Sequence, residues 1–200
     1  DEPTSNLETD DENDSVDIQI EDETLTTSKL KPNEIDNYVN NLKEMAEYWF
    51  YSYFPDDSSF SNEEKIWISK LNRIQIGYFR PLVVAALSKG RSIKPAERIA
   101  LFKSIERFIF VCFRIGGLRA NYQSSVYYNK SRAVLNNSTS LALLSKDLDS
   151  TVDKLMASAI GTFIIDTNRR FNSGEGFYKW YSLRYFLFEY ENDLACKFGI

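Results

Sequence analysis

Apolar side chains recur at steps of three and four residues along most of the chain after residue 31. This spacing follows the 3.6-residue period of an α-helix rather than the two-residue period of a strand. The first periodic segment starts at Pro32 and stops before Pro55, and it predicts an amphipathic helix with one buried face. The apolar positions of that face are Ile35, Tyr38, Val39, Leu42, Met45, Ala46, Trp49, Phe50 and Tyr53.

Further helices are predicted wherever the same period returns between turn-forming residues. The second helix starts at Ser61, a good capping residue, and carries Glu63 and Glu64 in its first turn, where the helix dipole favours acids. A break over 74–77 precedes a third helix that is apolar on all sides and is therefore expected in the core. The later elements are helices over 79–88, 95–115, 122–135, 147–157, 163–172 and 177–198, with one helical turn over 141–144.

The composition also favours helices. The 200 residues include 8 Gly and 5 Pro but 14 Phe, 12 Tyr and 3 Trp, so turn formers are few and large apolar side chains are many. We therefore predict an all-α fold, an irregular multi-helix bundle preceded by a disordered acidic N-terminal tail. The expected division is an acidic tail or linker over residues 1–31 and one helical domain over 32–200.

The net charge of −5 hides two opposite segments. Residues 1–30 hold eleven of the 29 acidic residues and one of the 24 basic ones, so the rest of the chain carries a net charge of +5. The acidic segment has too few apolar side chains to offset the entropy of ordering, which predicts a disordered tail or linker. A weak alternation over 17–22 leaves open a short strand that pairs with something outside this chain.

The basic charge is concentrated over residues 71–132, which hold twelve bases and two acids. A basic segment can face nucleic acid, the acidic tail or another acidic domain, and a solvated helix surface explains it equally well. If nucleic acid is the partner, we expect its phosphates to contact basic residues near helix ends and on helix faces. These candidate nucleic-acid-binding residues are Arg73, Arg80, Lys89, Arg91, Lys94, Arg98, Lys103 and Arg107.

The chain contains no histidine, and this excludes several kinds of catalytic site. Ser-His-Asp and Cys-His nucleophilic sites, His-ligated zinc and HNH-type nuclease chemistry all need one. Asp56 followed by Glu63-Glu64-Lys65 matches the letters of a PD…(D/E)xK nuclease motif. The two glutamates are explained by their position at the start of a helix, where they help to cap it. Asp147, Asp149 and Asp153 lack the glycine and the terminal Glu of a calcium loop. We therefore predict no catalytic residue, no metal ligand and no cofactor in this chain.

Two cysteines, Cys112 and Cys196, lie in apolar helical patterns without CxxC spacing. This usage is typical of buried, reduced thiols in a cytoplasmic protein. The longest fully apolar runs, 81–87 and 108–113, are far shorter than the roughly 20 residues that span a bilayer, so no membrane is expected as a partner. The chain begins at Asp1 rather than Met, and we expect it to be part of a longer protein.

Three segments together carry a family resemblance. They are 79–87 (FRPLVVAAL), 105–114 (IERFIFVCFR) and 183–191 (LRYFLFEYE). Their order and spacing resemble the helical middle of GmrSD-like proteins, bacterial anti-phage defence nucleases related to modification-dependent restriction enzymes. Those proteins join an N-terminal ParB-like DNase domain to a C-terminal HNH nuclease domain, and the resemblance covers roughly residues 35–200.

The resemblance implies a scaffold without catalysis of its own. The family's DGQQR-type motif and HNH histidines are absent from this chain, so no catalytic residue carries over. The implied partners are DNA and the flanking nuclease domains of a parent endonuclease, in which Mg²⁺ or another divalent metal would act. A homo-oligomer is left open. The competing hypothesis is a stand-alone helical domain that binds another protein.

Overall fold

The structure, a computed structural model, describes residues 31–199 apart from the side chain of Arg91. The predicted all-α fold is confirmed, since the described residues form helices and no strand. The predicted disorder of the acidic tail falls on residues 1–30, which lie outside the described residues. The seven α-helices are α1 (Pro32–Tyr53), α2 (Asn62–Ile74), α3 (Arg80–Ser88), α4 (Pro95–Phe108), α5 (Ser124–Leu135), α6 (Leu141–Asn172) and α7 (Leu183–Phe198).

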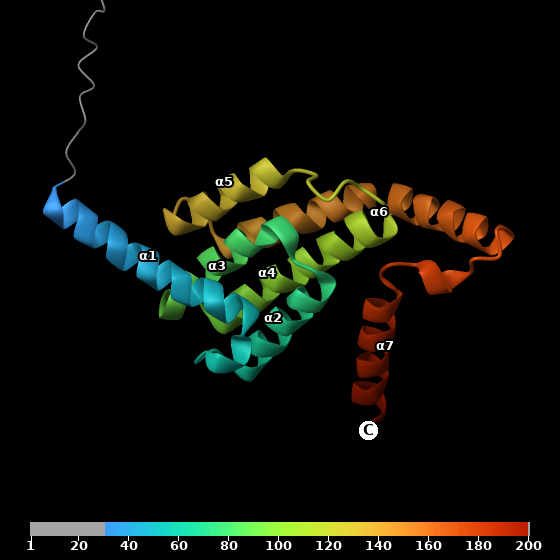
Figure 1. The fold of residues 1–200 in the computed structure, drawn as a ribbon, viewed down its shortest axis with the longest axis horizontal. Coiled ribbons are helices and arrows are strands. Elements are labelled where there is room, and N and C mark those ends of the chain that lie inside the picture. The colour runs from blue at the N-terminus through green and yellow to red at the C-terminus, as the bar shows by residue number, and fades with distance from the viewer. Residues whose placement is uncertain (1–30, 200) are drawn as a thin grey trace, which may run out of the picture.

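The helical body is built around α3, with α5 and α1 packed on it and with α4 between α2 and α6 (Figure 1). The prediction that the all-apolar third helix lies in the core is confirmed, because Leu82 and Leu87 are fully buried. Next to α3, the rings of Phe79, Phe108 and Tyr127 lie within 4.6–5.5 Å of one another, centre to centre. Tilted and edge-on aromatic contacts of this kind add to the stabilisation from apolar burial.

The predicted start of the second helix is also confirmed. Ser61 caps α2, with its Oγ accepting the main-chain N–H of Glu64, while the Glu64 carboxylate accepts the main-chain N–H of Ser61. This reciprocal arrangement satisfies two donors at the helix end that would otherwise lack acceptors.

The first helix forms where predicted, but most of its apolar face is not buried. α1 extends away from one end of the body, and Ser52 in its last turn is its one buried residue (Figure 1). Ile35, Tyr38, Leu42 and Trp49 are exposed. The prediction of a buried face is therefore wrong: of its nine positions only Met45 is partly buried, although α1 contacts α2 and α3 near its C-terminal end.

The fourth predicted helix has the expected extent but changes its winding. α4 continues directly into a π-helical segment, Ile109–Ile115. The Gly116 N–H donates to the Val111 carbonyl oxygen at 2.8 Å, a bond that spans five residues instead of four. π-helical turns are rare and recur at functional sites. Here the segment positions Arg114, which sits among apolar neighbours in the sequence.

Residues 141–172 were predicted as a turn and two short helices, and this is wrong. They form the single 32-residue helix α6. The expected break near Gly161 does not occur because an isolated glycine costs a helix only about 1 kcal/mol. The N-terminal half of α6 packs on α4 through Leu144, Leu148 and Val152, whereas the C-terminal half extends beyond the body (Figure 1).

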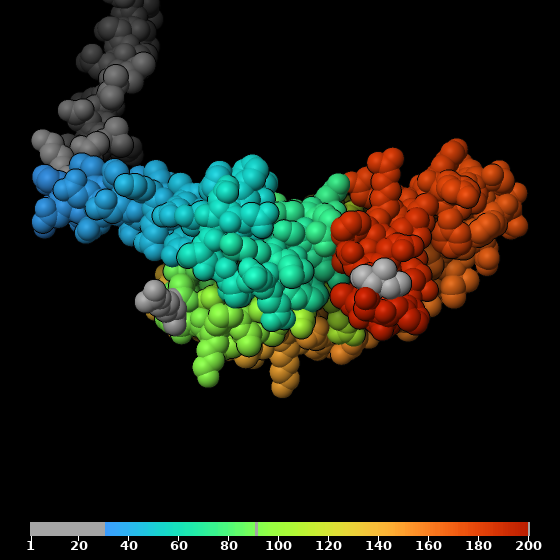
Figure 2. All heavy atoms as spheres, turned by 90° about the horizontal axis from the view of Figure 1, so that it is seen from below, coloured from blue at the N-terminus to red at the C-terminus, as the bar shows by residue number. Residues whose placement is uncertain are grey.

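The ends of the molecule therefore come from opposite ends of the chain. In the space-filling view α1 occupies one end, and the C-terminal half of α6 with α7 occupies the other (Figure 2).

Cys112 is buried as predicted, but Cys196 on α7 is exposed, which corrects the prediction of two buried thiols. Within residues 31–199, no helix combines the length and the apolar character needed to cross a bilayer.

Candidate anion-binding cleft

Two of the basic residues predicted to contact nucleic acid are buried. The Arg98 Nε donates to the Glu64 carboxylate at 2.5 Å, and its Nη1 donates to the carbonyl oxygens of Gly90 and Ile93 at 2.6 and 2.8 Å. This guanidinium joins the start of α2 to the loop before α4. With its donors used in the interior, Arg98 is not available to a phosphate at the surface.

Arg80 is the second buried arginine, and it fixes the end of α1. Its Nη1 donates to the main-chain oxygen of Ser52 at 2.9 Å, and its Nη2 donates to Asn72 Oδ1 at 3.0 Å. The guanidinium also lies 3.5 Å from the ring centre of Tyr53. Burial lowers the pKa of Arg80. Its role is therefore to connect α1, α2 and α3, which corrects its prediction as a surface contact.

Other predicted contacts lie at the surface but already have partners. Arg107 pairs with Asp149 at 3.2 Å and with Asp153 at 2.7 Å, so these two acids join α6 to α4. Lys89 donates to the carbonyl oxygen of Leu135 at 2.8 Å. Partly exposed pairs like these contribute little to stability, yet they compete with any bound phosphate for the same basic groups.

The remaining predicted residues are scattered. Lys94, which immediately precedes α4, and Lys103 in the middle of α4 are exposed, and Lys103 Nζ lies 5.4 Å from the ring centre of Trp67. The side chain of Arg91 lies outside the described residues. Of the eight predicted residues, Arg73 is the one that lines the cleft at the C-terminal end of the molecule.

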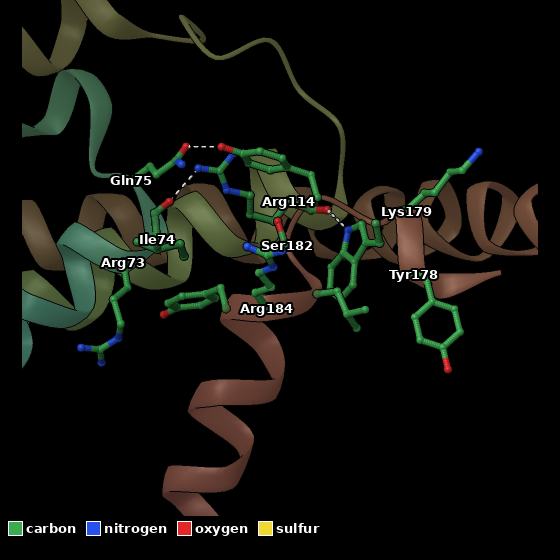
Figure 3. Close-up of a pocket in the computed structure, with 12 residues that line it drawn as sticks. Arg73, Ile74, Gln75, Arg114, Tyr178, Lys179, Ser182 and Arg184 are labelled. Carbon is green, nitrogen blue, oxygen red and sulfur yellow. Dashed lines mark hydrogen bonds between the residues drawn. The ribbon is translucent and has the colours of Figure 1, made fainter. Parts of the chain in front are cut away.

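This cleft has a volume of about 670 Å³ and lies between two walls that are far apart in the sequence (Figure 3). The first wall consists of Arg73, Ile74 and Gln75 at the end of α2 together with Arg114 from the π-helical segment. The second wall is the segment 178–185, which connects α6 to α7. A cleft of this size matches those that hold small ligands or a short piece of a polymer.

The second wall exists because α7 does not begin at Phe177, as the sequence predicted, but at Leu183. A 3₁₀ turn, Phe177–Lys179, is followed by extended backbone at Trp180 (φ −70°, ψ 118°). The Trp180 indole N–H donates to the Arg114 carbonyl oxygen at 3.3 Å. This bond joins the connecting segment to the body and favours a turn here over continued helix.

Arg114 gives the cleft a partly buried positive charge. Its Nη2 donates to the Ile74 carbonyl oxygen at 2.6 Å, and its guanidinium lies 5.4 Å from the ring centre of Tyr181. Burial lowers the pKa of Arg114, which means that its surroundings disfavour the charged form. No carboxylate of the described residues lies within 4.0 Å of this guanidinium.

Arg184 adds a second positive charge to the same space. It rises from the first turn of α7 toward the side of the cleft that holds Arg114 (Figure 3), and no described carboxylate pairs with it. Arg73 differs, because Glu189 neutralises it at 2.7 Å. No Asp or Glu is among the described residues that line the cleft. A bound anion would offset the desolvation of the Arg114 charge.

Sequence reasoning missed this site apart from Arg73. Arg114 lies between the apolar residues Phe113 and Ile115 in the sequence, and nothing in that pattern indicates what it faces. The available signal was the run 177–185, in which Lys179 lies between two aromatic residues and Arg184 precedes Tyr185. Basic and aromatic residues interleaved in this way are typical of nucleic-acid contacts, and the prediction of one continuous helix over the run concealed it.

No group of three or more His, Cys, Asp or Glu side chains in 31–199 could hold a metal ion. Comparison with other proteins adds no assignment: no protein-family model matches the chain, and neither the curated proteins nor the solved structures give a significant match. The cleft's own chemistry is therefore the basis for a function.

Proposed function

We propose that this chain is a non-catalytic helical scaffold domain that contacts the backbone of nucleic acid through the cleft lined by Arg114 and Arg184. The observation that carries the proposal is the partly buried Arg114 guanidinium, which lacks a carboxylate partner among the described residues and shares its cleft with Arg184. Phosphate, like carboxylate, matches the geometry of an arginine, because its oxygens accept two parallel N–H donors.

The arrangement of the helices supports the scaffold part of the proposal. α3, α4 and the first half of α6 form a packed body, while α1 and α7 extend from opposite ends (Figures 1 and 2). Such a body can hold two neighbouring domains at a fixed separation. The resemblance of 79–87, 105–114 and 183–191 to GmrSD-like nucleases suggests a DNA-restricting parent protein, in which the cleft would guide the strand between catalytic domains.

The proposal is tested by nucleic-acid binding across a salt series, measured by fluorescence polarisation with duplex and single-stranded oligonucleotides. Arg184→Gln removes a charge that faces the cleft and has no described partner. Because each phosphate contact contributes about 0.7–0.9 to the slope of log Kd against log salt, this variant should lower that slope by about that amount. Arg132→Gln is the matched control, because Arg132 is also an exposed arginine but lies on α5, outside the cleft.

Two results would overturn the proposal. One is the absence of binding to either kind of oligonucleotide at about 50 mM salt, where phosphate contacts are strongest. The other is an equal change of slope in the Arg184→Gln and Arg132→Gln proteins, since general loss of charge and not the cleft would then explain the effect.

A second candidate function, a helical domain that binds another protein, is favoured by the exposed face of α1. Ile35, Tyr38, Leu42, Met45 and Trp49 follow a 3-4-3-4 spacing, the pattern of a helix that packs along another helix. Binding of a partner helix through this face would depend little on salt, whereas nucleic-acid affinity falls steeply with salt. The salt series therefore separates the two functions.

A further inference from the structure

The cleft carries exposed aromatic rings as well as arginines. Tyr178 is 92% exposed and Tyr181 is 69% exposed, although both are large side chains that usually bury most of their surface. Both line the same cleft as Arg114 and Arg184. Exposed aromatic rings beside unneutralised guanidinium groups form a surface that can bind a ligand with both a flat ring and a phosphate.

The Tyr181 ring is held in place despite its exposure. Its hydroxyl donates to Gln75 Oε1 at 2.6 Å, and the guanidinium of Arg114 lies 5.4 Å from its ring centre. The next residue toward α6, Trp180, is held by its own bond to the Arg114 carbonyl oxygen. A ring that is fixed before binding loses little conformational entropy when a ligand stacks on it.

We propose that the cleft binds an unpaired nucleotide of a single strand, with the base stacked on Tyr181 and the adjacent phosphates at Arg114 and Arg184. This inference rests on the proposed function and specifies its ligand. In a duplex the base faces are stacked on one another and are not available to a protein ring, whereas an unpaired base offers its face. Stacking of this kind tolerates all four bases, so little sequence preference is expected.

The test measures the affinity of the full 200-residue chain for a labelled oligothymidine, for a duplex, and for a strand of the same length with abasic sites. Tyr181→Leu should weaken binding to the oligothymidine about 5- to 150-fold, the range observed for the loss of one stacked base. It should leave binding to the abasic strand unchanged. Tyr181→Phe keeps the ring and should retain most of the affinity. Tyr38→Leu on α1 is the matched control, because Tyr38 is 67% exposed but lies outside the cleft.

The outcomes separate this inference from the proposed function. If the duplex and the abasic strand bind as tightly as the oligothymidine, and Tyr181→Leu has no effect, the cleft contacts phosphates alone: the stacking inference is then wrong while the proposed function stands. If none of the three nucleic acids binds at low salt, both fail. A preference for the oligothymidine that Tyr181→Leu abolishes and Tyr38→Leu preserves supports both.

Discussion

The buried pair of Glu64 and Arg98 offers the sharpest test of how this fold is held together. The Glu64 side chain is 1% exposed and accepts hydrogen bonds from Ser61 as well as from Arg98. Arg98→Met keeps much of the length of the side chain but removes its donors to the carboxylate and to two carbonyl oxygens. A buried carboxylate is then left without its opposite charge, which costs about 3–5 kcal/mol.

This loss is large against the total stability of a domain, about 5–15 kcal/mol. At about 2–4 °C per kcal/mol for a chain of this size, Tm should fall by about 6–20 °C. Urea unfolding followed by circular dichroism measures the change in free energy directly. Glu63→Gln is the matched control, because Glu63 neighbours Glu64 on the same helix but is exposed, and a surface change of this kind stays within about 0.5 kcal/mol.

The same pair predicts a dependence on pH. Burial raises the pKa of Glu64, but the hydrogen bonds from Ser61 and Arg98 outweigh it and lower the pKa below its ordinary value of 4.5. A carboxylate with a lowered folded-state pKa stabilises the fold above its unfolded-state pKa and loses that contribution as pH falls through the folded-state value. The wild-type chain should therefore lose more stability than Arg98→Met between about pH 5 and pH 3.

Replacing both partners, Glu64→Leu with Arg98→Met, should be much less damaging than Arg98→Met alone, because no charge then remains unpaired in the interior. The reasoning would be refuted if Arg98→Met destabilised the chain by less than about 1 kcal/mol, or if its loss of stability on acidification matched the wild type. Either result would mean that the carboxylate is solvated or satisfied by Ser61 alone.

The remaining predictions concern two glycines and the two cysteines. Gly116→Ala should destabilise the chain by about 1–3 kcal/mol, because the added Cβ would lie 3.0 Å from two main-chain oxygens of the π-helical segment and 3.1 Å from the Cβ of Ala159. Gly161→Ala, in open space inside α6, should instead stabilise it by about 0.5–1 kcal/mol, and urea unfolding of both variants checks the contrast. A thiol reagent at pH 8 should label Cys196 rapidly and Cys112 only in urea, because Cys112 is buried and its pKa is raised to about 11.

The sequence predicted most helices because the apolar period and the capping residues are local signals. Ser61 and Glu64 define the start of α2 in the sequence as they do in the structure. The period of α1 also located its apolar face correctly. It did not reveal that the face is exposed, because burial depends on whether another element reaches that surface, and this is not a local property.

The candidate site was largely hidden from sequence reasoning for the same reason. Arg73 and Glu189 are 116 positions apart, and the neutralisation of Arg73 follows from a tertiary contact. Arg98 and Arg80 looked like surface bases in the sequence, and their buried partners come from elements distant along the chain. The number of basic side chains can be counted from a sequence. Whether a given one is available to bind an anion can be judged only from the folded structure, because its partners come from other elements.

The extension of α6 beyond the body has a mechanical consequence for the cleft. At 1.5 Å per residue the helix is about 48 Å long, and the part from Gly161 to Asn172 forms a lever arm of about 17 Å. The second wall of the cleft is attached to the tip of this arm, whereas Arg114 belongs to the body. A tilt of about 10° at Gly161 would displace the tip by about 3 Å. Trp180 would move less, because its ring lies 5.4 Å from the ring of Phe163 at the base of the arm, where it also donates to the Arg114 carbonyl oxygen. The wall is also tied to the body through α7, by the hydrogen bond from Tyr185 to Glu106 and the ion pair of Arg73 with Glu189, so α6 and α7 together set the width of the cleft.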